Sequence, residues 1–139
     1  MSYVLSVLVP AYNEASTIAR VLDALLAVEL IEGGRMEVVV VDDGSSDGTG
    51  DAIRAYQQQY PQAPIRYFSH ERNQGKGSAL QTAIQAAAGE YLIVQDADLE
   101  YDPREFNHLL RPMLEGHADV VYGSRFAGHQ PHRVLFFWH

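Results

Sequence analysis

Apolar residues along the chain follow two patterns, which together predict alternating strands and helices. Continuous runs rich in β-branched residues predict buried strands at 4–9, 38–41, 65–68, 91–94 and 119–122. Between them, apolar residues recur every three or four positions, as on one face of a helix. Three such faces are Ile18, Val21, Leu22, Leu25 and Leu26; Leu80, Ala83, Ile84 and Ala87; and Phe106, Leu109, Leu110, Met113 and Leu114.

Turn-forming and capping residues set the expected ends of these elements. Pro10 is expected to end the first strand, and Ser16 to cap the helix that follows. Asp47 or Thr49 can cap a further helix that runs to about Tyr60.

The capping-box pattern at 102–105 predicts a last helix, with a proline at its first position. Strands that are apolar throughout and alternate with amphipathic helices indicate a mainly parallel sheet with helices on both faces. The chain of 139 residues is long enough for one domain with a core of its own. We therefore predict a single α/β domain over residues 1–139.

Composition and charge exclude several functions. The net charge is −8 and Lys76 is the single lysine, which argues against binding of a nucleic-acid backbone. The absence of cysteine excludes disulfides and thiolate metal sites. No apolar run approaches the ~20 residues of a membrane span, and no signal peptide is indicated. These features predict a soluble, cytoplasmic protein.

Polar segments follow four of the predicted strands, at 12–14, 42–49, 96–100 and 123–125. In open α/β sheets ligands bind outside the carboxyl ends of the strands, so these segments are expected to converge on one crevice. Asp96 and Asp98 should project the same way, with the small Ala97 between them. Two carboxylates aimed at one point favour a hard cation such as Mg²⁺ or Mn²⁺. The alternative is a solvated acidic loop that caps a helix.

Other phosphate-binding chemistries fit less well. The glycines around Lys76 lack the third glycine of a dinucleotide fingerprint, because Leu80 stands there, and His70 replaces the first glycine of a P-loop. A phosphotransferase with Asp42, Asp43 or Asp96 as nucleophile stays open as an alternative.

Five segments in order, VLVPAYNE, VVVVDDGSSDGT, NQGKGSAL, QDADLEYDP and VVYGSRF, resemble the inverting glycosyltransferases of the GT-A type. The closest likeness is to the dolichyl- or polyprenyl-phosphate sugar synthases, such as dolichyl-phosphate mannose synthase, and it spans nearly the whole chain. The resemblance implies a nucleotide-diphosphate sugar of the GDP-mannose or UDP-glucose type as donor. It also implies a Mg²⁺ or Mn²⁺ ion, and displacement at the anomeric carbon by a polyprenyl phosphate at a membrane surface, in cell-envelope or glycan biosynthesis.

The resemblance also implies donor-binding residues on the first two strand ends. The loop that starts at Pro10 would hold the nucleoside, with Tyr12 against the base and Glu14 close to it. Val41 and Asp43 would close the other side of the base. Taken alone, Tyr12 could be an ordinary surface aromatic and Asp43 a turn residue that bonds its own backbone.

The acidic stretch would bind the diphosphate and its cation. By resemblance, Asp96 and Ala97 lie along the ribose and phosphates, Asp98 binds the metal, and Glu100 stands at the position of a second metal ligand. The expected catalytic set is Asp96, Asp98 and Arg125, whose guanidinium suits bidentate contact with phosphate oxygens. The alternative for Arg125 is a surface ion pair.

Lys76 lies at a predicted helix start, where backbone N–H groups and the helix dipole favour an anion, so we expect it to contact a phosphate or the sugar. The apolar segment 133–139 has nothing after it to bury it, whereas the family continues beyond this point. We therefore expect a fragment of a longer protein that is peripheral to a membrane. The alternatives are a short tail that folds back on the core, and a non-enzymatic nucleotide-sugar-binding fragment that associates through its apolar end. The oligomeric state stays open.

Overall fold

A computed structural model describes residues 2–98, 102–116, 120–122 and 133–136 of the chain. The strands are β1 (Val4–Ala11), β2 (Arg35–Asp43), β3 (Ile65–His70), β4 (Tyr91–Val94), β5 (Val120–Tyr122) and β6 (Arg133–Phe136). The α-helices are α1 (Ile18–Leu26), α2 (Thr49–Gln59), α3 (Lys76–Ala86) and α4 (Phe106–Leu114). Two short 3₁₀ helices, η1 (Ile31–Gly33) and η2 (Pro103–Glu105), precede β2 and α4.

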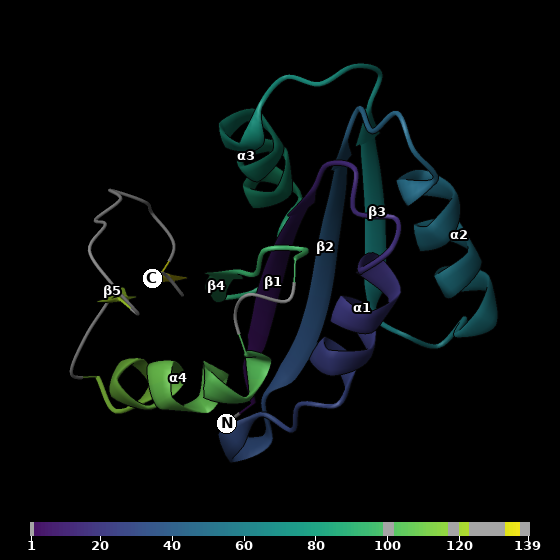
Figure 1. The fold of residues 1–139 in the computed structure, drawn as a ribbon. Coiled ribbons are helices and arrows are strands. Elements are labelled where there is room, and N and C mark those ends of the chain that lie inside the picture. The colour runs from purple at the N-terminus through teal and green to yellow at the C-terminus, as the bar shows by residue number, and fades with distance from the viewer. Residues whose placement is uncertain (1, 99–101, 117–119, 123–132, 137–139) are drawn as a thin grey trace.

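The strands form one sheet in the order β3-β2-β1-β4-β6-β5, and the pairings between them are parallel. β1 lies inside the sheet, and its Val7 is in register with Val38 of β2 and Ile93 of β4. Figure 1 shows α1 and α2 on one side of these strands and α3 on the other. The predicted mainly parallel sheet with helices on both faces is confirmed.

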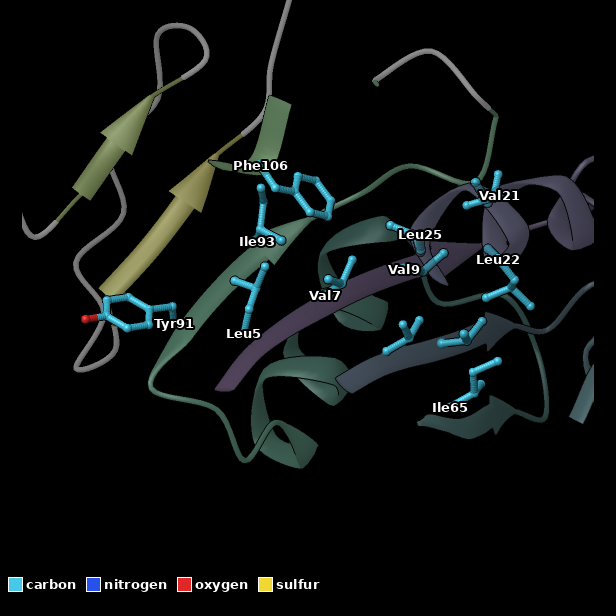
Figure 2. Packing of buried hydrophobic residues seen from close by; sticks show 14 of the residues in the cluster. Leu5, Val7, Val9, Val21, Leu22, Leu25, Ile65, Tyr91, Ile93 and Phe106 are labelled. Carbon is cyan, nitrogen blue, oxygen red and sulfur yellow. The ribbon is translucent and has the colours of Figure 1, made fainter. Parts of the chain in front are cut away.

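The two faces of the sheet carry two separate cores, because successive side chains of a strand point to opposite faces. On one face, Val7, Val9 and Ile93 pack with the buried residues of α1, α2 and α4, and Figure 2 shows part of this cluster. On the other face, Leu8 and Val39 pack with the small side chains of α3. The expected apolar faces of α1 and α4 are buried at Ile18, Val21, Leu22, Leu25, Phe106, Leu109, Leu110 and Met113, with Leu26 and Leu114 packed against them.

The expectation that Pro10 ends the first strand is wrong, because β1 continues to Ala11. The carbonyl of Leu8 accepts a hydrogen bond from the Gln95 amide at 2.9 Å, on the β4 side. Pro10 faces that same side two residues later, where the pairing with β4 has ended at Val94. The N–H that proline lacks therefore leaves no ladder bond unmade, and Pro10 pairs in register with Val41 on the other side.

Two of the expected helix caps are also wrong. α1 follows Thr17 and not Ser16, and no side chain caps its first turn. α2 follows Gly48 and not Asp47 or Thr49, although the Asp47 carboxylate accepts a hydrogen bond from the amide of Thr49 at 2.9 Å. Asp102 is a cap, as predicted, since its side chain accepts a hydrogen bond from the Arg104 amide and Pro103 follows it, but the turn that it caps is the 3₁₀ turn at 103–105 that precedes α4.

The apolar segment at 133–139 was expected to have nothing to cover it, but its described part pairs within the sheet. Its residues Arg133–Phe136 form β6, which pairs with β4 on one side and β5 on the other. The partner β4 is distant in the sequence, so no local pattern indicated this pairing. No helix in the described ranges is long and apolar enough to cross a membrane.

Candidate functional site

A cleft of about 280 Å³ lies at the carboxyl ends of β1, β2 and β4. Parallel strands in register end at the same edge of a sheet, which brings residues from distant segments together there. The sequence-predicted residues that line the cleft are Pro10, Tyr12, Glu14, Asp43, Lys76, Asp96, Ala97 and Asp98. Ala11, Asn73 and Ala79 line it as well, and the sequence analysis gave them no role.

One predicted site residue does not line this cleft, and two others lie outside the described residues. Val41 is fully buried in the core that packs on α3 and does not line the cleft. Glu100 and Arg125 lie outside the residues that the structure describes. Their expected roles stay predictions.

The loop after β1 is fixed to the loop after β2. Asn13 has a left-handed backbone (φ 53°), and its side-chain oxygen accepts a hydrogen bond from the Ser46 amide at 2.9 Å. The next amide, that of Glu14, donates to the Thr49 hydroxyl at 2.9 Å. The half-exposed ring of Tyr12 therefore projects from a loop whose backbone is held on its carboxyl side.

Thr17 joins the first loop to the acidic segment after β4. Its hydroxyl lies 2.7 Å from the carbonyl oxygen of Ala97 and 2.9 Å from a carboxylate oxygen of Glu14. The sequence analysis missed this residue, because a threonine just before a helix is usually explained as a cap. The contact fixes the backbone of the buried Ala97 and with it the position of its neighbours Asp96 and Asp98 at the cleft.

The two aspartates of the acidic segment differ in their surroundings. Asp96 is mostly buried, and one of its oxygens lies 2.6 Å from Nζ of Lys76, at the start of α3. Asp98 is exposed at the cleft. Lys76 thus lies at the cleft beside the acidic pair.

The donor set fits a divalent cation that is shared with a ligand. In the part of the chain that the structure describes, no group of three or more His, Asp or Glu side chains could enclose a metal ion. Mg²⁺ is commonly held by one or two carboxylates together with substrate phosphates, and so needs no complete protein cage. The exposed carboxylate of Asp98 suits this arrangement, and Glu100 would be a second protein ligand.

Asp43 is buried and hydrogen-bonded by three donors, one at the end of β3 and two in the loop that links β3 to α3. Its Oδ1 lies 2.7 Å from Nδ1 of His70 and accepts from the Gln74 amide at 3.0 Å, while Oδ2 accepts from the Gly75 amide at 2.9 Å. Burial alone would raise the pKa of this carboxyl, but the amide of Gln74, His70 and the amide of Gly75 outweigh it and lower the pKa. Asp43 is therefore a carboxylate at neutral pH.

The neighbouring Asp42 also bonds the backbone, with Oδ1 accepting from the Ser45 amide at 3.1 Å in a turn of the Asx type. Asp42 does not line the cleft. Two of the three carboxylates proposed as nucleophiles in the phosphotransferase alternative are thus engaged with loop backbone, and the third, Asp96, is paired with Lys76. Sequence reasoning missed His70, although its place at a strand end next to Asp43 follows from the register of β2 and β3.

Comparison with known proteins identifies the family. The model of the family described as glycosyl transferase family 2 matches residues 6–134. The chain belongs to this family. The resemblance that the five sequence segments indicated is confirmed.

One relative of this family 2 chain is the dolichyl-phosphate beta-glucosyltransferase of Dictyostelium discoideum, which is 32% identical to it over 130 residues. The match covers 87% of this chain and 39% of the relative. The mannosyltransferase PcManGT from Pyrobaculum calidifontis, solved with GDP-Man and Mn²⁺, has a TM-score of 0.68 and 34% identity over 76% of this chain and 30% of its own.

The glucosyl-3-phosphoglycerate synthase of Mycobacterium tuberculosis, solved with Mn²⁺, UDP and glucosyl-3-phosphoglycerate, has a TM-score of 0.66 and 28% identity over 86% of this chain and 43% of its own. These matches confirm the GT-A fold. The family 2 chain spans less than half the length of each of these three proteins.

Proposed function

We propose that this family 2 chain binds a nucleotide-diphosphate sugar with a divalent cation and supplies the donor side of an inverting glycosyl transfer to a polyprenyl phosphate. The observation that carries the proposal is the meeting of Tyr12, Lys76 and the acidic pair Asp96 and Asp98 in one cleft at the strand ends. Family membership supports it, since the model of glycosyl transferase family 2 matches residues 6–134, which include all of these residues.

In the proposed complex the nucleoside lies between the two loops that follow β1 and β2. Tyr12 offers a half-exposed ring for stacking on the base, and Glu14 lines the same wall. The diphosphate then extends over the end of β4, beside Ala97. Asp43 shapes the floor, because its carboxylate oxygens bond the loop that borders the cleft.

The charge of the leaving group accounts for the remaining residues. A nucleoside diphosphate gains negative charge as the glycosidic bond breaks, and a cation held by Asp98 and Glu100 would offset it. Lys76 adds a fixed positive charge at the same place, 2.6 Å from Asp96. Arg125 is proposed to contact the phosphates as well, through a bidentate guanidinium.

The acceptor is proposed from chemistry and from one relative. A phosphate monoester is already ionised at neutral pH, so its oxygen can attack the anomeric carbon without a general base. The relative from Dictyostelium discoideum is named as a dolichyl-phosphate glucosyltransferase, and a polyprenyl phosphate is an acceptor of this kind. We also propose that the longer protein works at a membrane surface, where such a lipid resides.

A thermal-shift panel tests the donor. The chain is heated with GDP-mannose, UDP-glucose and other nucleotide sugars, each with Mn²⁺, with Mg²⁺ and with chelator. Binding to the folded state adds about 2.7 kcal/mol of stability at a ligand concentration 100 times Kd, so the right donor should raise the melting temperature only when a cation is present. No shift with any donor under any condition would refute the proposal.

Asp98→Asn tests the metal role. We expect the variant to lose at least tenfold in affinity for the donor in the presence of Mn²⁺, because a neutral amide is a poorer ligand for a hard cation. Without ligand its melting temperature should match that of the wild type, since Asp98 is exposed. Asp51→Asn is the matched control, because Asp51 is an exposed carboxylate on α2 and its ion pair with Arg54 adds little stability. Calorimetry that finds equal donor affinity for Asp98→Asn and the control would exclude Asp98 as a ligand.

A further inference from the structure

We propose that His70 is a positioning residue, which acts through Asp43 to hold the β3–α3 loop in the shape that places Asn73 and Lys76 at the cleft. What the cleft binds rests on the proposed function, whereas the positioning role of His70 rests on contacts within the protein. His70 and Asp43 are the last residues of neighbouring strands and lie in register. The side chain of His70 is only 10% exposed.

The chemistry of the contact fixes which ring nitrogen of His70 carries a proton. Asp43 is ionised and can only accept, so Nδ1 of His70 must donate to it across 2.7 Å. The other ring nitrogen, Nε2, lies 2.8 Å from the hydroxyl of Thr82 on α3. A neutral His70 therefore has its hydrogen on Nδ1, and its Nε2 is an acceptor for the Thr82 hydroxyl, whose single hydrogen also has the Ser78 carbonyl within reach at 3.2 Å. The imidazole is held at both ends, by β2 on one side and α3 on the other.

Asp43 passes this constraint on to the loop. The carboxylate that accepts from His70 also accepts from the amides of Gln74 and Gly75, at 3.0 Å and 2.9 Å. Gly75 has φ +100°, a backbone that other residues rarely adopt, and it is followed at once by Lys76, the first residue of α3. Figure 1 shows this loop passing over the ends of the strands on its way from β3 to α3.

Loss of the Nδ1–H donor would leave a buried carboxylate with one bond fewer. The carboxylate could then turn toward other donors, and the two loop amides would lose a fixed acceptor. Since Lys76 follows Gly75 directly and reaches Asp96 at 2.6 Å, a shift of the loop displaces the Lys76 ammonium group at the cleft. His70 itself does not line the cleft, so it acts through Asp43 and does not contact the ligand.

The first test is made on the ligand-free chain. We expect long-range ¹⁵N–¹H correlation at a pH where the imidazole is neutral to show hydrogen on Nδ1 of His70, with the signal assigned by its loss in His70→Leu. Hydrogen exchange at the Gln74 and Gly75 amides should be at least tenfold faster in His70→Leu than in the wild type. In His70→Asn, whose amide can still donate to Asp43, it should stay within threefold of the wild type.

The second test is donor binding, measured by calorimetry with GDP or UDP and Mn²⁺. Affinity should fall about tenfold in His70→Leu and recover in His70→Asn, which a residue that only stabilises the fold would not show. Should the wild type bind no nucleotide, the proposed function fails while the exchange rates still decide the role of His70. A folded His70→Leu variant with wild-type exchange at both amides would refute the positioning role of His70. If that variant does not fold, hydrogen on Nε2 in the neutral wild type overturns it.

Discussion

Replacing Gly44 by alanine should separate two loops that border the cleft. Gly44 follows β2 directly and has φ +68°. A Cβ built there would stand 2.2 Å from the carbonyl carbon of Arg72 and 2.3 Å from the amide nitrogen of Asn73. Both atoms belong to the backbone of the β3–α3 loop, so no side-chain rotation can relieve the overlap.

The expected cost has two parts. A left-handed backbone costs a residue with a Cβ roughly 1–2 kcal/mol relative to glycine. Overpacking against a wall that cannot rotate away costs typically about 1–3 kcal/mol more. We therefore expect Gly44→Ala to lower the free energy of unfolding by about 2–5 kcal/mol. The overlap falls on the peptide bond between Arg72 and Asn73, and Asn73 lines the cleft, so donor affinity should fall as well.

Urea unfolding followed by far-UV circular dichroism measures the first effect, and calorimetry the second. Gly48→Ala is the matched control, because Gly48 lies in the same loop with φ −84° and a Cβ there would meet nothing within 4 Å. The control should change the free energy of unfolding by no more than about 0.5 kcal/mol. If Gly44→Ala is as stable as the control, the close approach of the two loops is refuted.

Three further substitutions test the core, a partly buried carboxylate and the cleft. Phe106→Ala removes a fully buried ring and should lower the free energy of unfolding by about 3–5 kcal/mol in the same urea assay. Burial alone would raise the pKa of Glu37, but hydrogen bonds from Ser6, the Ala88 amide and Arg66 lower it. The stabilisation by the Glu37 carboxylate is therefore complete above its ordinary pKa of about 4.3 and is lost as the pH falls through its lower folded pKa. Between about pH 7 and pH 3 the urea midpoint should therefore fall less steeply in Glu37→Gln than in the wild type. Lys76→Met should weaken GDP or UDP binding about tenfold in calorimetry, because it removes the positive charge beside Asp96 at the cleft; unchanged binding would exclude Lys76 from the phosphate contact.

The sequence alone determined the elements whose signal is local. The run at 91–94 predicted β4 with its observed bounds, because a continuous apolar run of this length that contains an aromatic and two β-branched residues favours a buried strand over a helix. The helical face that includes Leu22 and Leu25 is buried as expected. From alternating strands and helices, the meeting of the polar strand ends in one crevice also followed, because parallel strands present their carboxyl ends to the same edge.

Only the tertiary structure decided which partner each polar side chain has. The contacts of His70 with Asp43, and of Thr17 with Ala97, join residues that no periodicity relates, since each depends on which strands and loops become neighbours. Pro10 shows the same limit, because whether its missing N–H ends a strand depends on where β4 stops. Hydrophobic patterns record which face of an element is buried, whereas a hydrogen bond requires a specific donor and acceptor to meet, and the packing of distant segments determines that meeting.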